Sequence, residues 1–117
     1  MVNLTNLMRL KGAISAAECK PDGVHISYIV KSNQTQNQDK MTERFCAINT
    51  LMATVVENID HISEMNWAPF RGWAFFAGDY SVFVASNIIL IVETGKADFN
   101  NIYKILSEEA SIALQAA

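Results

Sequence analysis

A single stripe of apolar side chains in the middle of the sequence constrains its fold more than any other feature. Successive members of the stripe are separated by gaps of 4, 3, 4, 3, 4 and 3 residues, the spacing of one face of an α-helix. They are Met41, Phe45, Ile48, Met52, Val55, Ile59 and Ile62. Leu51 and Val56 widen this stripe beyond what packing on one sheet face needs. The pattern predicts a long helix over residues 41–62 that can contact two partners.

The segment before this helix has the pattern of a short helix followed by a hairpin. Residues 3–10 place leucine and methionine at helical spacing, and Gly12 follows as a helix stop. Residues 13–19 and 24–30 are rich in apolar and β-branched side chains and flank Lys-Pro-Asp-Gly at residues 20–23, a typical turn sequence. We therefore expect two antiparallel strands joined by a tight turn.

The expected turn also predicts a register for the hairpin. If the two ends of the turn over residues 20–23 pair with each other, Glu18 lies opposite His25, and Cys19 lies opposite Val24. We therefore expect His25 and Glu18 to form an ordinary cross-strand pair. We expect Cys19 to be packed among apolar neighbours.

A meander of three strands is expected after the long helix. Residues 70–77, 80–85 and 88–94 are β-rich, and the dipeptides Gly-Asp at 78–79 and Ser-Asn at 86–87 suit two-residue hairpin turns.

A last helix follows, for which Asp98 is a suitable N-cap and residues 99–114 carry an apolar stripe. The predicted element order is αββαβββα in a single α/β (α+β) domain over residues 1–117.

Composition and charge narrow the classes of partner. Half of the 117 residues are hydrophobic and only 18% are charged, which favours contact with another protein. The nine basic residues are scattered and the net charge is -3, so we expect no nucleic-acid partner. The longest aliphatic run, residues 88–92, is far shorter than the ~18 residues of a spanning helix, so no membrane insertion is expected. Without a signal-peptide pattern, a cytoplasmic location is predicted.

No pattern of catalytic or metal-binding residues stands out. The two cysteines, Cys19 and Cys46, are 27 residues apart, and without a secretory context we expect reduced thiols that are packed or interfacial. Neither has a cysteine or histidine at metal-ligand spacing, so we expect no metal and no cofactor. The glycines do not form a phosphate loop, and no paired carboxylates or Ser/His/Asp order is apparent. A non-enzymatic protein is predicted.

The element order and one local motif resemble a known family. A long helix between a hairpin and a meander is similar to the layout of roadblock-like dimerisation domains, which are related to profilin-like folds, over almost the whole chain. The segments Pro-Phe-Arg-Gly-Trp-Ala at residues 69–74 and Gly-Asp-Tyr-Ser-Val at residues 78–82 resemble a small uncharacterised bacterial family of the same fold. The resemblance implies a five-stranded antiparallel sheet with the long helix on one face and the terminal helices on the other.

The resemblance also implies a homodimer. In roadblock-like domains the central helix and the first strand of the meander form a two-fold interface. Carried over to this chain, these elements contribute Met41, Phe45, Ile48, Met52, Val55, Ile59, Phe70, Trp73 and Phe75. The apolar strand suits this role independently, because an unpaired apolar edge is an aggregation hazard and Arg71 is its only charged guard.

These observations lead to one principal functional hypothesis and two alternatives. The principal one is a homodimeric scaffold or regulator, whose heterologous partner is, by resemblance, a small GTPase or a larger protein complex. A small-ligand sensor instead predicts a cavity near Tyr28, Tyr80 or Trp67. An accessory or thiol carrier of a bacterial sulfur-oxidising system related to heterodisulfide reductase, a role suggested by some relatives, needs a reactive thiol at Cys19 or Cys46.

Overall fold

The computed structural model describes residues 3–19, 26–31, 37–67 and 70–116. The elements follow the predicted order αββαβββα. They are α1 (Leu4–Met8), β1 (Ala13–Cys19), β2 (Ile26–Val30), α2 (Gln38–Ile62), β3 (Gly72–Phe76), β4 (Tyr80–Ala85), β5 (Ile88–Glu93) and α3 (Phe99–Ala116).

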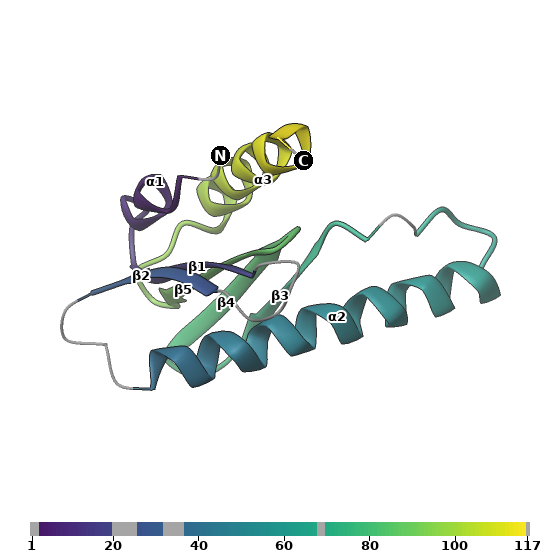
Figure 1. Ribbon diagram of the computed structural model, residues 1–117, viewed down its shortest axis with the longest axis horizontal. Coiled ribbons are helices and arrows are strands. Elements are labelled where there is room, and N and C mark those ends of the chain that lie inside the picture. Colours follow the sequence, from purple (N-terminus) through teal and green to yellow (C-terminus); the bar gives the residue numbers. More distant parts are fainter. Residues whose placement is uncertain (1–2, 20–25, 32–36, 68–69, 117) are drawn as a thin grey trace.

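The five strands form one antiparallel sheet in the order β2-β1-β5-β4-β3. The first hairpin and the meander therefore join through β1 and β5, and the two edges of the sheet are β2 and β3 (Figure 1). The predicted five-stranded sheet is confirmed, and the architecture is compatible with the roadblock-like layout. Gly12, whose φ of 85° suits glycine, leads the chain from α1 into β1.

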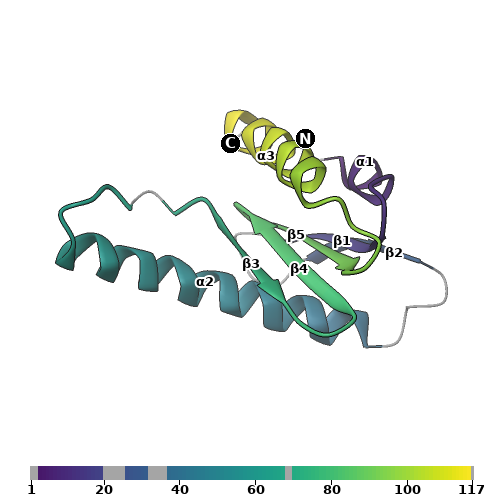
Figure 2. The ribbon, with the colours of Figure 1, turned by 180° about the vertical axis from the view of Figure 1, so that it is seen from behind.

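Helices cover both faces of the sheet. The long helix α2 crosses one face, while α1 and α3 lie together on the other (Figures 1 and 2). The N-terminal part of α2 runs along the sheet, whereas its C-terminal part extends past the sheet beneath the segment that returns to β3 (Figure 1). This layered arrangement is the one implied by the resemblance.

The side chains between these layers form two separate clusters. The cluster on the α1 and α3 side contains ten buried residues: Leu7, Leu10, Ala13, Ala16, Ile88, Leu90, Val92, Ile102, Leu106 and Ala110. The cluster on the α2 side contains six buried residues, all from strands: Ile14, Ala17, Val82, Val84, Ile89 and Ile91. Helix α2 contributes only the partly buried Phe45 and Cys46 to this second cluster. The principal core therefore contains no residue of α2.

The predicted register of the first hairpin is wrong. Glu18 pairs with Ser27, and Cys19 pairs with Ile26, so the ladder is shifted by two residues from the expected pairing. The expected partners His25 and Val24 lie outside the described residues, as does the turn. The expected pairing assumed strands that continue to residues 19 and 24, whereas β1 ends at Cys19 and β2 begins at Ile26. A shift of two leaves each side chain on its expected face, so alternation alone cannot detect it.

The bounds of two further elements also differ from expectation. Helix α2 begins at Gln38, three residues before the apolar stripe, because its first turn is polar and the periodic pattern does not register it. Strand β3 starts at Gly72, so Phe70 precedes the strand and is not part of it. Asp98 accepts a hydrogen bond from the Asn101 backbone N–H at 3.2 Å, which confirms its N-cap role for α3.

Candidate functional site

The apolar stripe of α2 lies largely uncovered. Among the α2 side chains that the structure describes, only Thr42 is buried. The seven stripe residues fall into two adjacent rows: Phe45, Met52 and Ile59 are half-buried, whereas Met41, Ile48, Val55 and Ile62 are exposed. Val55 is 38% exposed and Ile62 is 86% exposed. An apolar helix face left in water is a feature of binding surfaces.

The edge strand β3 is a second apolar element, and it contacts α2. Phe75 is 54% exposed and Phe76 is 61% exposed, while Trp73 is half-buried against α2. Gly72–Phe76 contains no charged residue, and Arg71 directly precedes it. The strand thus has few of the charges that usually protect an open edge.

The backbone groups on the free edge of β3 can be assigned from the ladder with β4. Ser86 donates its N–H to the Arg71 carbonyl at 2.9 Å, and Ala77 donates to the Tyr80 carbonyl at 3.1 Å. Hydrogen-bonded pairs alternate in an antiparallel ladder. The odd-numbered residues of β3 therefore bond to β4, and Ala74 directs its N–H and C=O away from β4, towards the open edge.

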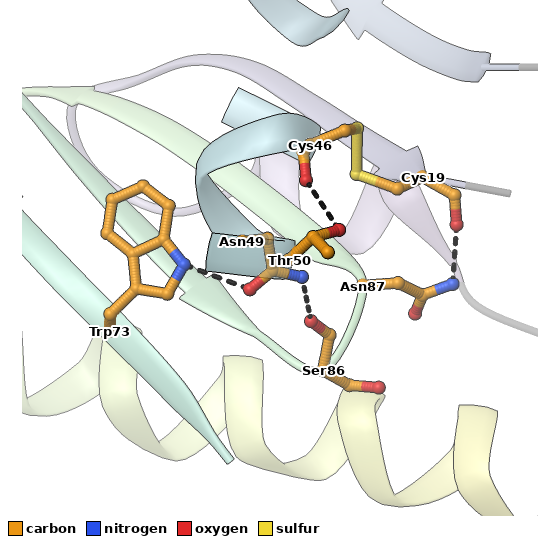
Figure 3. Close-up of a disulfide and its surroundings, with 7 residues drawn as sticks. All are labelled: Cys19, Cys46, Asn49, Thr50, Trp73, Ser86 and Asn87. Carbon is orange, nitrogen blue, oxygen red and sulfur yellow. Dashed lines mark hydrogen bonds between the residues drawn. A yellow bond between two sulfur atoms is a disulfide. The ribbon is translucent and has the colours of Figure 1, made fainter. Parts of the chain in front are cut away.

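A disulfide joins α2 to the sheet. The Sγ atoms of Cys19, at the end of β1, and Cys46, in the third turn of α2, are bonded, with a Cα–Cα distance of 5.9 Å (Figure 3). The expectation of two reduced thiols is therefore wrong for this structure. The two cysteines are 27 residues apart in the sequence and meet only because α2 crosses the end of β1, so the sequence alone does not indicate the contact. Both cysteines are half-buried at the margin of the second cluster.

Asn49, one turn after Cys46, connects α2 to two further elements. Its Nδ2 donates to the Ser86 carbonyl in the β4–β5 turn at 2.8 Å, and its Oδ1 accepts from the Trp73 indole Nε1 at 2.9 Å (Figure 3). Residues three apart share a helix face, so Cys46 and Asn49 both point to the sheet.

Asn87 supports the disulfide from the same β4–β5 turn. Its Nδ2 donates to the Cys19 carbonyl at 2.7 Å, and the Cys19 N–H donates to the Asn87 carbonyl at 2.8 Å. We refer to Cys19, Cys46, Asn49, Trp73, Ser86 and Asn87 as the α2 clasp. Sequence reasoning missed three members: Asn49, Ser86 and Asn87. Two signals in the sequence pointed to Asn49. It lies three residues after Cys46 on the same helix face, and the indole N–H of Trp73 needs an acceptor when it is half-buried.

A group of aromatic rings lies on the opposite face of the sheet. Phe76, Phe83 and Phe99 pack with ring centroids 5.3 to 5.7 Å apart and join the edge of the sheet to the start of α3. Tyr103, one turn further along α3 from Phe99, is 75% exposed.

The ionisable groups in the described part of the chain make local contacts. No group of three or more His, Cys, Asp or Glu residues there is placed to hold a metal ion. Lys96 donates to the Glu93 carboxylate at 2.9 Å, and this hydrogen bond lowers the pKa of Glu93 and raises the pKa of Lys96. Buried Glu109 accepts hydrogen bonds from Asn3 and Asn6. It joins α3 to α1, which is a structural role.

Two features of the described residues bear on the alternative functions. A depression lined by residues 78–80 and 93–96 includes Tyr80, but it is open to solvent, and its Glu93 and Lys96 already pair with each other. A thiol carrier needs an accessible thiol, whereas both Sγ atoms here are bonded to one another. No helix in the described ranges is long and apolar enough to cross a membrane.

Comparison with known proteins identifies the family. The model of a family described as an uncharacterized conserved protein, DUF2173, matches residues 3–108. The chain belongs to the DUF2173 family. The match begins at the Asn3 cap of α1 and extends into α3, so the DUF2173 region contains the whole sheet and the α2 clasp. No curated protein and no solved structure matches the chain.

Proposed function

We propose that this DUF2173 protein is a non-enzymatic homodimeric scaffold, in which α2 and β3 of one copy bind α2 and β3 of another. The observation that carries the proposal is the contiguity of two uncovered apolar elements. The hydrogen bond between Asn49 and Trp73 joins α2, which carries the exposed row, to β3, which forms the open edge. Burying both in one interface removes apolar surface from water and pairs the free backbone groups.

A second copy of this chain is the occupant that fits the surface best. An antiparallel strand can pair with its own copy about a two-fold axis, which gives an isologous interface in which each patch meets its equivalent. The absence of charge from Gly72 to Phe76 means that self-pairing places no like charges of that strand against each other. The result is one continuous ten-stranded sheet, with the α2 helices packed together on one face.

The heterologous partner binds elsewhere on the dimer in this proposal. The exposed aromatic side chains Phe76, Phe99 and Tyr103 lie on the face opposite to α2, so self-association of α2 leaves them available. The resemblance to roadblock-like domains favours a small GTPase or a larger protein complex as the class of partner.

A proline at Ala74 tests the strand pairing without altering the internal ladder. The Ala74 N–H faces the open edge, so Ala74→Pro removes a donor to the second copy and keeps the bonds to β4. We expect the wild type and a control, Ala74→Thr, to have the solution mass of a dimer, and Ala74→Pro to be a folded monomer. An Ala74→Pro variant with the wild-type dimer affinity would refute pairing through β3.

A further inference from the structure

We propose that Cys19 and Cys46 form a reversible dithiol–disulfide couple whose redox state determines whether α2 is held on the sheet. The inference begins with where the disulfide lies. It connects α2 to the end of β1 and contributes nothing to the principal core between the sheet, α1 and α3. A bond in this position constrains one helix and not the whole molecule.

Apart from the disulfide, few interactions attach α2 to the sheet. The described side chains of α2 include one buried residue, Thr42, and only Phe45 joins Cys46 in packing against the second cluster. Asn49 adds two hydrogen bonds. The C-terminal part of α2 extends past the sheet (Figure 1). Opening α2 exposes the six strand residues of the second cluster but leaves the ten residues of the principal cluster buried, so loss of the disulfide should loosen α2 before the rest of the fold.

The sheet is able to remain folded when α2 is loosened. The ten buried residues of the principal cluster come from α1, β1, β5, α3 and the α1–β1 connection, and all of them are independent of the α2 clasp. Loosening α2 would expose the second cluster, which lies on the side of the sheet that α2 covers. Its six buried side chains all belong to strands.

Neither cysteine of the disulfide is fully buried, which favours exchange with a dithiol. Both cysteines are half-buried, so neither is enclosed in the principal core. A thiolate of a dithiol reductant attacks one sulfur, breaks the Cys19–Cys46 bond and forms a mixed disulfide, while the other sulfur leaves as a thiolate and is protonated. The second thiol of the reductant then releases the protein. Two electrons and two protons pass to the cysteines, and the reductant becomes a disulfide.

The redox state would control self-association, a consequence that rests on the proposed dimer. With the disulfide formed, α2 and its apolar stripe are held on the sheet. After reduction, binding a second copy must also order α2, and ordering a loosened segment weakens association. We expect the dissociation constant of the dimer to rise about tenfold or more on reduction.

Hydrogen exchange and solution mass, measured on oxidised and reduced wild type, test the inference. The protein is reduced with dithiothreitol without denaturant and reoxidised with oxidised glutathione. A Cys19→Ser/Cys46→Ser variant serves as a redox-insensitive control. We expect reduction to speed exchange in α2 about tenfold or more, to change exchange in β5 and α3 less than twofold, and to be reversed by reoxidation.

Each contrary outcome has a distinct meaning. A disulfide that is reduced only in denaturant, or whose reduction unfolds β5 and α3 together with α2, is a permanent structural link and overturns the inference. Unchanged exchange in α2 after complete reduction also overturns it, even if the protein is a dimer. If the oxidised wild type is a monomer, the proposed dimer fails, while redox-dependent exchange in α2 still supports the couple itself.

Discussion

The indole Nε1 of Trp73 donates a hydrogen bond to Oδ1 of Asn49 at 2.9 Å, which joins the edge strand β3 to the middle of helix α2. The same amide donates from Nδ2 to the Ser86 carbonyl, so one side chain fixes α2 against two strands of the meander. This relationship joins the helix that carries the exposed row to the strand at the open edge of the sheet, and the proposed interface uses both elements.

Removing the Asn49 amide should weaken the attachment of α2. Asn49→Ala leaves a half-buried indole N–H and a backbone carbonyl without this partner, which costs about 1–3 kcal/mol in the free energy of unfolding. Asn58→Ala, at an exposed position on the same helix, should change stability by less than about 0.5 kcal/mol. Urea denaturation of the two variants measures the difference. Equal stabilities would show that the Asn49 contacts contribute nothing to folding.

The carboxylate of Glu109 should stabilise the contact between α3 and α1. Its Oε2 accepts from the Asn3 backbone N–H at 3.0 Å, and its Oε1 lies 3.5 Å from the Asn6 amide nitrogen. Glu109→Ala leaves these donors unpaired in a buried site and should lower the free energy of unfolding by about 1–3 kcal/mol. Glu108→Ala, at the exposed neighbouring position, is the matched control and should be nearly neutral. A neutral Glu109→Ala would contradict the structural role of this buried side chain.

Gly72 should not tolerate a side chain. A Cβ at this position would lie against the Val84 carbonyl oxygen of the neighbouring strand, well inside the 3.0 Å that real Cβ atoms respect. Gly72→Ala should therefore destabilise the protein by about 1–3 kcal/mol through backbone displacement. A Cβ at Gly78 meets nothing within 4 Å, so Gly78→Ala provides the comparison. A lower melting temperature for Gly78→Ala than for Gly72→Ala would show that the β3–β4 contact is wrongly placed.

The elements of this fold follow from local patterns in the sequence. The 4-3 spacing from Met41 to Ile62 is found on α2, and the apolar segments around the two dipeptide turns are found on β3, β4 and β5. Such periodicities depend only on residues within the same element, so one sequence suffices to detect them. The role of Asp98 as an N-cap is equally local and is confirmed.

The α2 clasp could not be predicted in the same way. The bond between Cys19 and Cys46 depends on where α2 crosses β1, a tertiary relationship that neither residue's neighbours encode. Asn49 looks like an ordinary polar residue of a helix until Trp73 is placed opposite to it. The register of the first hairpin failed for a related reason, because a shift of two residues preserves the alternation from which it was inferred.

The stripe itself illustrates what periodicity leaves open. It predicts one apolar face, yet the structure divides that face into a half-buried row that includes Met52 and an exposed row that includes Val55. Spacing shows which residues share a side of the helix. It does not show how much of that side the sheet covers, which is the quantity that decides whether a second partner is needed.

The most direct test of the proposed dimer is solution mass by light-scattering chromatography on wild type, Val55→Asp and Thr50→Asp. Val55 lies in the exposed row of α2, and a charge forced into a dry interface is strongly unfavourable unless it is paired. Thr50→Asp places the same charge at an exposed position of the same helix, on the side of Glu43 and Glu57. We predict that the wild type and Thr50→Asp are dimers and that Val55→Asp is a folded monomer. A monomeric wild type, or a Val55→Asp variant that remains fully dimeric, would contradict the account.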